Sequence, residues 1–173
     1  EARLGHDRTR VLPAMRFSEP SIESALRELA ALGIRDAVGI ILSPQFSPLL
    51  MGGYARAIET ARAAIGPAAP GVSVAGAWHR EPAFVEALAG RIREALLHVA
   101  GDGAKSPRAV PVLLTAHSLP RAVAEREPGY PAQLRETAEA VARAAGLGPD
   151  QWHFCWQSAG HEPGEWMKPD FVD

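Results

Sequence analysis

The sequence contains one cysteine, Cys155, among its 173 residues. A single cysteine excludes an internal disulfide framework and any cysteine-rich zinc or iron–sulfur site. No uninterrupted apolar run approaches the roughly 20 residues that a membrane-spanning helix needs. The formal net charge is −2, and the arginines are scattered rather than clustered, which gives no basis for binding a nucleic-acid backbone. We therefore predict a cytoplasmic protein without a membrane span and without a nucleic-acid partner.

Several familiar catalytic and nucleotide-binding patterns are also missing. The chain carries neither the Gly-x-Ser-x-Gly pattern of a hydrolase nucleophile nor the Walker pattern of a phosphate-binding loop. No Gly-x-Gly-x-x-Gly follows an apolar run, which argues against the usual dinucleotide-binding fold. These absences leave no firm cofactor. The chain begins at Glu1 rather than at a methionine and stops after Asp173, and we expect it to be the interior of a longer protein.

The sequence does have the composition of a globular α/β protein, with 47% hydrophobic and 22% charged residues. Apolar runs alternate with amphipathic stretches of helical period, which is typical of parallel sheets flanked by helices. The runs at 36–42 and 109–115 are almost continuously apolar, which predicts burial on both faces. The predicted strands span residues 10–15, 36–42, 72–78, 109–115 and 152–157. The predicted helices run from a cap at Ser18 to just before Gly33, and over 51–65, 81–99 and 131–145.

Residues 101–107 form the most linker-like stretch of the chain, because glycine, aspartate, serine and proline are concentrated there. We therefore predict a boundary between two lobes at this point, with residues 1–103 in the first and 104–173 in the second.

His117 is the best-placed candidate for chemistry. It directly follows the apolar run at 112–116, and ligands of open parallel sheets bind outside the carboxyl ends of the strands. With an ordinary pKa of about 6.5, an imidazole there is neutral near pH 7 and able to ligate a metal or accept a proton. The alternative is that His117 only hydrogen-bonds a loop carbonyl. Its position in the sequence leaves both interpretations open.

Polar side chains follow two other predicted strands. Gln45, Ser47 and Tyr54 come after the strand at 36–42, where an amide and hydroxyls among apolar residues suit a flat organic ligand. The alternative is that the aromatic and methionine side chains nearby simply pack the start of the next helix. Ser158 and Trp166 follow the last predicted strand, where small residues leave room for a ligand and Trp166 provides a wall. The alternative for Trp166 is that it anchors its loop.

Several ordered motifs resemble those of the ferrochelatases, the enzymes that insert ferrous iron into a porphyrin in haem biosynthesis, and in particular the soluble bacterial coproporphyrin-type branch. The resemblance extends over essentially the whole chain, with weaker matches at 15–23, 42–47 and 78–84. The strongest motifs are Ala116-His117-Ser118-Leu119-Pro120, Gly129-Tyr130-Pro131-Ala132-Gln133, Trp156-Gln157-Ser158-Ala159-Gly160 and Trp166-Met167-Lys168-Pro169-Asp170.

The resemblance implies two incomplete, flavodoxin-like half-lobes, with residues 1–103 ending one chelatase lobe and 104–173 beginning the next. It implies that His117 faces the porphyrin centre, where it binds ferrous iron as a substrate or receives pyrrole protons, and that Tyr54 lines the porphyrin site. The remaining substrate-binding candidates are Gln45, Ser47, Ser158 and Trp166. A neutral imidazole suits this chemistry, because two N–H protons must leave the ring and hydrated iron must lose water.

The chain departs from the family pattern in three places. Gln45 replaces the usual histidine of a Pro-His-Phe-Ser loop, and residues 127–130 replace the common Gly-Asp-Pro-Tyr. The family's partner glutamate lies in a segment beyond the Trp-x-x-Pro-Asp motif and has no counterpart in this chain. We therefore expect an internal fragment whose iron insertion is weak or absent in isolation.

Two alternative functions remain open. One is a chelatase that inserts cobalt into a sirohydrochlorin-type ring, although Gln45 argues mildly against it because those proteins use pairs of histidines. The other is a tetrapyrrole-binding fragment without catalytic activity. Porphyrin that binds but is never metallated would favour the second alternative.

Overall fold

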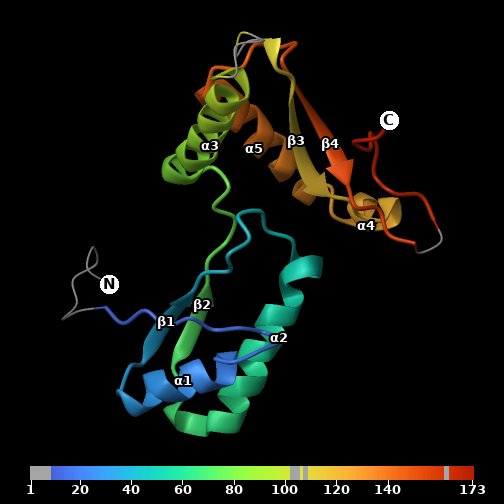
Figure 1. Ribbon diagram of the computed structural model, residues 1–173. Coiled ribbons are helices and arrows are strands. Elements are labelled where there is room, and N and C mark those ends of the chain that lie inside the picture. The colour runs from blue at the N-terminus through green and yellow to red at the C-terminus, as the bar shows by residue number, and fades with distance from the viewer. Residues whose placement is uncertain (1–8, 102–105, 107–108, 162–163) are drawn as a thin grey trace. The chain divides into compact units, whose positions relative to one another are not determined.

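The computed structural model describes residues 9–101, 106, 109–161 and 164–173 (Figure 1). In chain order the elements are α1 (Ile22–Ala31), β1 (Asp36–Gly39), α2 (Pro48–Ile65), the 3-10 helix η1 (Gly66–Ala68), β2 (Gly71–Val74), α3 (Pro82–Gly101), β3 (Val112–His117), α4 (Arg121–Arg126), α5 (Gly129–Ala145) and β4 (Trp152–Gln157). The chain forms two compact units. The first contains residues 1–42 and 48–76, and the second contains residues 43–47 and 77–173.

The first unit is a two-stranded parallel sheet with α1 and α2 packed against each other beside it. β1 pairs with β2 in a register that runs from Asp36 opposite Gly71 to Gly39 opposite Val74. The buried core consists of Leu26 from α1 with Ile58 and Ala61 from α2, surrounded by Ile22, Leu29, Ile65 and Val72. Apolar residues three and four apart on each helix produce this shared face, and their removal from water stabilises the unit.

The helix α1 begins one turn later than its predicted cap. Ser21, not Ser18, is the N-cap, because the Ser21 hydroxyl accepts a hydrogen bond from the Ser24 backbone N–H at 3.1 Å. The helix ends as predicted before Gly33, which has a φ of 72° that favours glycine.

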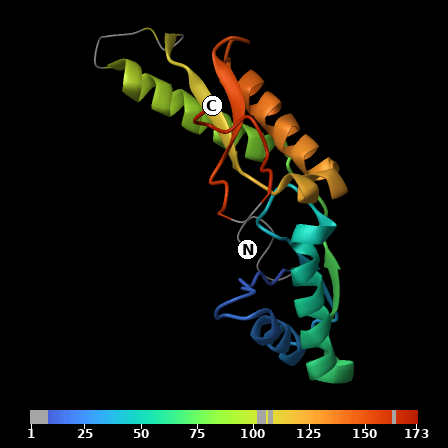
Figure 2. The same cartoon turned by 90° about the vertical axis from the view of Figure 1, so that its right-hand side faces the viewer.

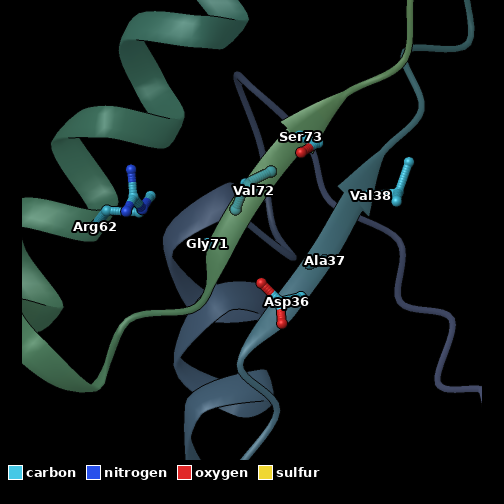
Figure 3. Close-up of a pocket in the computed structure, with 7 residues that line it drawn as sticks. All are labelled: Asp36, Ala37, Val38, Arg62, Gly71, Val72 and Ser73. Carbon is cyan, nitrogen blue, oxygen red and sulfur yellow. The ribbon is translucent and has the colours of Figure 1, made fainter.

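A shallow hollow lies on this first sheet (Figure 3). It is lined by residues 36–38 of β1, residues 71–73 of β2 and Arg62 of α2. The Arg62 Nε donates to the Pro70 carbonyl at 3.1 Å, and one Nη donates to Glu59. None of the site residues predicted from the sequence lines this hollow.

The second unit contains another parallel sheet and a pair of helices. β3 pairs with β4 from Val112 opposite Trp152 to His117 opposite Gln157. The helices α3 and α5 lie side by side (Figures 1 and 2). Ala89 on α3 and Ala138 and Ala142 on α5 are buried, and small side chains of this kind allow two helices to approach closely.

The strand predictions are confirmed in order and type for four of the five runs. The run at 152–157 is a strand over its whole length, and the other three have shifted or shortened ends. The prediction at 10–15 is wrong: this segment makes an isolated bridge between Met15 and Ser21 instead of a strand. Pro13 lies within it and has no N–H to donate to a sheet. The helix α4 was not predicted.

The prediction that two of the strands are buried on both faces was also wrong. Val38 of β1 is 70% exposed and Leu113 of β3 is 53% exposed. Among the described residues, exposure alternates along both β1 and β3, so one face of each strand is exposed.

The predicted lobe boundary at 103–104 lies outside the described residues. The compact units divide elsewhere, because α3 packs against α5 and belongs to the second unit. The assignment of 1–103 and 104–173 to two lobes of a larger chelatase stays a prediction. In the described parts of the chain, every helix is too short or too polar to cross a membrane.

Candidate functional site

His117 lies at the carboxyl end of the second unit's sheet. It is the last residue of β3, and the strand's alternation leaves it exposed together with Leu113 and Thr115. Its register partner is Gln157, the last residue of β4, so both side chains project from the same face. The imidazole is therefore at the rim of the sheet and accessible, not enclosed among aliphatic neighbours.

Gln157 adds polar groups beside His117 that the sequence analysis did not single out. The Thr115 hydroxyl donates to Gln157 Oε1 at 3.0 Å, which orients the amide on the exposed face. The Ser118 backbone N–H donates to the Gln157 carbonyl at 2.7 Å and continues the pairing beyond the strands. The sequence signal for Gln157 was its position at a strand end, but only the register places it opposite His117.

Ser158 and Trp166 lie in the segment that follows β4. Ser158 is exposed and has a φ of 58°, a left-handed conformation that is uncommon outside glycine. Trp166 forms a backbone bridge with Pro120, and a Cβ added at Gly160 would lie 2.8 Å from its ring. The loops after β3 and β4 are thus joined through Trp166. These contacts support the anchoring role considered for Trp166, and its contact with a porphyrin stays a prediction.

Gln45 and Ser47 are held inside the second unit. Gln45 is 7% exposed, and its Nε2 donates to Thr137 Oγ1 at 2.9 Å. Ser47 is 1% exposed, and its hydroxyl donates to the Glu127 carboxylate. Their role as substrate contacts stays a prediction, and their burial assigns them structural partners on α5 and just before it.

Tyr54 belongs to the first unit, on α2. The Arg16 guanidinium lies 5.6 Å from the centroid of the Tyr54 ring and 4.5 Å from that of Phe17. A cation over an aromatic face is an attractive contact. Sequence reasoning missed Arg16 as a neighbour of Tyr54, because the two residues are far apart in the chain and no local pattern links them.

The described residues contain no group of three or more histidine, cysteine, aspartate or glutamate side chains that would hold a metal ion. Cys155 is buried, and burial raises the pKa of its thiol, with a further contribution from the charge of Asp170. The thiol is therefore protonated near neutral pH, which agrees with a core residue rather than a nucleophile.

Comparison with known proteins identifies the family. The family model described as ferrochelatase matches residues 1–173. The chain belongs to the ferrochelatase family. The resemblance stated from the sequence is thereby confirmed.

Three relatives show how much of the family the chain covers. The ferrochelatase of Deinococcus radiodurans is 38% identical over 156 residues, which are 90% of this chain and 48% of the relative. The coproporphyrin III ferrochelatase of Bacillus subtilis is 34% identical over 160 residues, 92% of this chain and 49% of the relative. That of Anoxybacillus flavithermus is 32% identical over 164 residues, with 95% and 50% covered. The chain spans about half the length of the curated relatives it matches.

In this ferrochelatase-family chain, Gly53 makes room for Arg16 beside Tyr54. A Cβ added at Gly53 would lie 2.2 Å from the guanidinium carbon of Arg16. We expect Gly53→Ala to displace this flexible guanidinium from Tyr54 while the free energy of unfolding stays the same or rises by up to about 1 kcal/mol, because alanine favours a helix over glycine. Urea denaturation of both proteins measures this change. A loss of more than about 1 kcal/mol would show that Arg16 cannot move aside.

A second polar cluster joins the segment before α3 to α5. His79 Nε2 lies 2.9 Å from Glu136 Oε2, and Arg80 donates to the same oxygen from its Nε at 2.9 Å and from one Nη at 2.7 Å. The hydrogen bond from His79, followed by that from Arg80, holds the pKa of Glu136 below its ordinary value of 4.5.

This lowered pKa predicts how stability depends on pH. A carboxylate with a depressed folded-state pKa contributes stability that is present above its unfolded pKa and is lost as the pH falls through the folded value. We therefore expect Glu136→Gln to lower the melting temperature at pH 7, and the difference from the wild type to shrink as the pH falls below about 4.5. Thermal unfolding between pH 3 and 7 measures it. Glu139→Gln on the same helix is the control, and an equal pH-dependent difference for both variants would contradict the prediction.

Proposed function

We propose that this chain is part of an enzyme that inserts ferrous iron into a porphyrin, coproporphyrin III or protoporphyrin IX, in haem biosynthesis, and that it works in the cytoplasm. The observation that carries the proposal is the exposed imidazole of His117 at the carboxyl end of β3, within a chain that matches the ferrochelatase family throughout. Relatives named coproporphyrin III ferrochelatase support the substrate class. The single cysteine supports a reducing compartment.

His117 has the chemistry that this reaction needs. Insertion of ferrous iron forms bonds from the metal to the ring nitrogens and releases the two protons of the N–H groups. The exposed imidazole accepts one of these protons, or replaces a water ligand as the iron approaches the ring. No group of metal-ligating side chains surrounds His117 in the described part of the chain, and iron enters the reaction as a substrate that passes to the porphyrin.

Ser158, Trp166 and Tyr54 are the proposed porphyrin contacts besides His117. Ser158 combines exposure with a left-handed backbone conformation, and conformations of this kind occur preferentially at functional sites. Trp166 and Tyr54 offer aromatic faces that suit a flat macrocycle. Gln45 and Ser47 are retained as predicted contacts, although their burial also suits a purely structural role.

A spectral titration tests the proposal. Coproporphyrin III is added to the 173-residue chain and to the longest natural polypeptide that contains it, and ferrous iron is then added without oxygen. A shifted Soret band followed by the spectrum of the iron porphyrin is the expected result for the longer protein, with weak or no metallation by the chain alone. Porphyrin that binds but is metallated by neither iron nor cobalt would favour a non-catalytic binder. Cobalt insertion into a sirohydrochlorin-type ring without iron insertion would favour the other chelatase, and failure to bind any porphyrin would overturn the proposal.

A further inference from the structure

The segment of residues 43–47 is an unusual part of the first half of the chain. The residues on either side of it, up to Leu42 and from Pro48, belong to the first unit, but the segment itself belongs to the second. It follows β1 by a few residues and leads directly into α2. These five residues therefore need contacts of their own with the rest of the second unit, because their neighbours in the chain belong to the first.

The segment is bound by side chains that project from one face of α5. Phe46 and Gln133 make a reciprocal pair: the Phe46 backbone N–H donates to Gln133 Oε1 at 2.9 Å, and Gln133 Nε2 donates to the Phe46 carbonyl at 3.2 Å. One helical turn further on, Thr137 Oγ1 accepts from Gln45 Nε2 at 2.9 Å and donates to the Gln133 carbonyl at 2.9 Å. Residues four apart lie on the same face of a helix, so the two contacts act together.

We propose that Gln133 and Thr137 of α5, with Glu127 before it, form a clamp for residues 43–47, and that Gln45 is a positioning residue of this clamp. Glu127 receives the hydrogen bond of the buried Ser47 hydroxyl. Three successive residues, 45 to 47, are thus bound to the second unit by a side-chain amide, a main-chain amide and a hydroxyl. The proposal does not depend on the proposed iron insertion.

Burial of these polar groups favours the arrangement in which residues 43–47 are bound to α5. Gln45, Ser47 and Thr137 are all buried, and a buried polar group that loses its partner costs more than the bond itself contributes. If Gln45 left Thr137 without an equivalent partner, the buried Gln45 amide would lose its hydrogen bond, and the Thr137 hydroxyl would keep only the bond that it donates to the Gln133 carbonyl. The side-chain amide of Gln45 can donate to the Thr137 hydroxyl in this buried position. The exposed polar residues of the candidate site, His117 and Gln157, lie instead at the strand ends.

The chain passes from the first unit to the second again at residues 76–77, and the segment that follows is hydrogen-bonded to residues 43–47. The Trp78 backbone N–H donates to the Pro44 carbonyl at 2.9 Å, which ties residues 77–80 to the clamped segment. His79 and Arg80 bind Glu136, which lies between Gln133 and Thr137 in the helix sequence. The same turn of α5 therefore holds both segments at which the chain passes between the two units.

Hydrogen exchange of the Phe46 amide reads the clamp directly, because this N–H is bound to Gln133. We expect Thr137→Val and Gln45→Ala each to accelerate exchange in peptides that cover residues 44–47 by about fivefold or more, the effect of leaving one buried partner unsatisfied. Thr137→Ser keeps the hydroxyl and restores wild-type exchange. Because both single variants break the same bond, the double variant exchanges little faster than either one.

The controls separate a local clamp from general loss of structure. Thr115→Val makes the same chemical change at an exposed position of β3 and leaves exchange at 44–47 unaltered. Gln133→Ala removes the acceptor of the Phe46 N–H and accelerates exchange at Phe46, whereas Gln133→Glu keeps an oxygen acceptor and retains protection there. Unchanged exchange at 44–47 in both Thr137→Val and Gln45→Ala, or faster exchange in Thr137→Ser equal to that in Thr137→Val, would overturn the proposal.

Porphyrin titration of the same variants distinguishes the two roles of Gln45. If Gln45 only positions residues 43–47, Gln45→Ala and Thr137→Val change porphyrin affinity to the same extent, or neither of them changes it. Weaker binding in Gln45→Ala alone, with exchange at 44–47 unchanged, would assign Gln45 to the porphyrin and overturn its role in the clamp. The exchange measurement contains no porphyrin, so its result stands whether or not iron insertion is found.

Discussion

Replacing His117 with alanine is expected to lower the rate of iron insertion by about 100-fold or more in the longest natural polypeptide that contains this chain. The imidazole is exposed at the end of β3, and alanine can neither accept a pyrrole proton nor displace water from iron. Porphyrin affinity should change little, because the contacts proposed for Ser158, Trp166 and Tyr54 remain. Initial rates of metalloporphyrin formation and a porphyrin titration measure the two quantities separately.

His153 provides a matched control for this experiment. It is also an exposed histidine. It lies on β4, two residues before Cys155, and its register partner on β3 is Leu113. His153→Ala removes an imidazole near the amino end of β4, away from the carboxyl ends of the strands where His117 lies, and it should leave the rate unchanged. An equal loss in both variants would point to a general effect on the sheet, and an unchanged rate in His117→Ala would remove His117 from the mechanism.

Trp156→Ala is expected to destabilise the second unit by about 3–5 kcal/mol, the range for deleting a large buried aromatic side chain. Trp156 is 0% exposed. Its ring packs edge-to-face against Phe154 with centroids 5.2 Å apart. Its backbone is bound to residues 169–171, because the Trp156 N–H donates to the Pro169 carbonyl and the Trp156 carbonyl accepts from the Phe171 N–H, each at 2.8 Å. The variant leaves a cavity where these segments meet. Chemical denaturation followed by far-UV circular dichroism measures the loss.

Trp156→Phe tests the physical cause of that loss. Phenylalanine fills most of the space and removes the indole N–H, which is buried and has no hydrogen-bond partner among the described residues. The free energy of unfolding should therefore fall by about 1.5 kcal/mol or less. If Trp156→Phe were as damaging as Trp156→Ala, the indole N–H and not the volume of the ring would be the important feature.

The elements that could be predicted were those with a strong local signal. The run at 152–157 is rich in aromatic residues and bounded by turn residues, and it is a strand over its predicted length. The helix before Gly33 ends where predicted, because a glycine with positive φ stops a helix locally. The prediction of a strand at 10–15 was wrong because a strand needs a partner strand, and the hydrophobic pattern around Pro13 does not supply one.

The candidate site divides in the same way. The position of His117 after an apolar strand was readable from its neighbours in sequence, and its exposure agrees with a place at the sheet edge. The partners of Gln45 and Ser47 were not readable, because Thr137 and Glu127 are 92 and 80 positions away. An amide and a hydroxyl in a loop have the same sequence appearance whether they line a pocket or bind a helix.

The sequence alone therefore determined the family, the alternation of strands and helices, and the histidine at the end of a strand, because each depends on residues that are close together in the chain. Only the tertiary structure decided that Gln157 stands opposite His117, that Arg16 covers Tyr54, and that residues 43–47 are bound to α5. These pairings depend on register and on contacts between distant segments. Such contacts leave no periodic trace in the sequence, since they are set by the packing of whole elements.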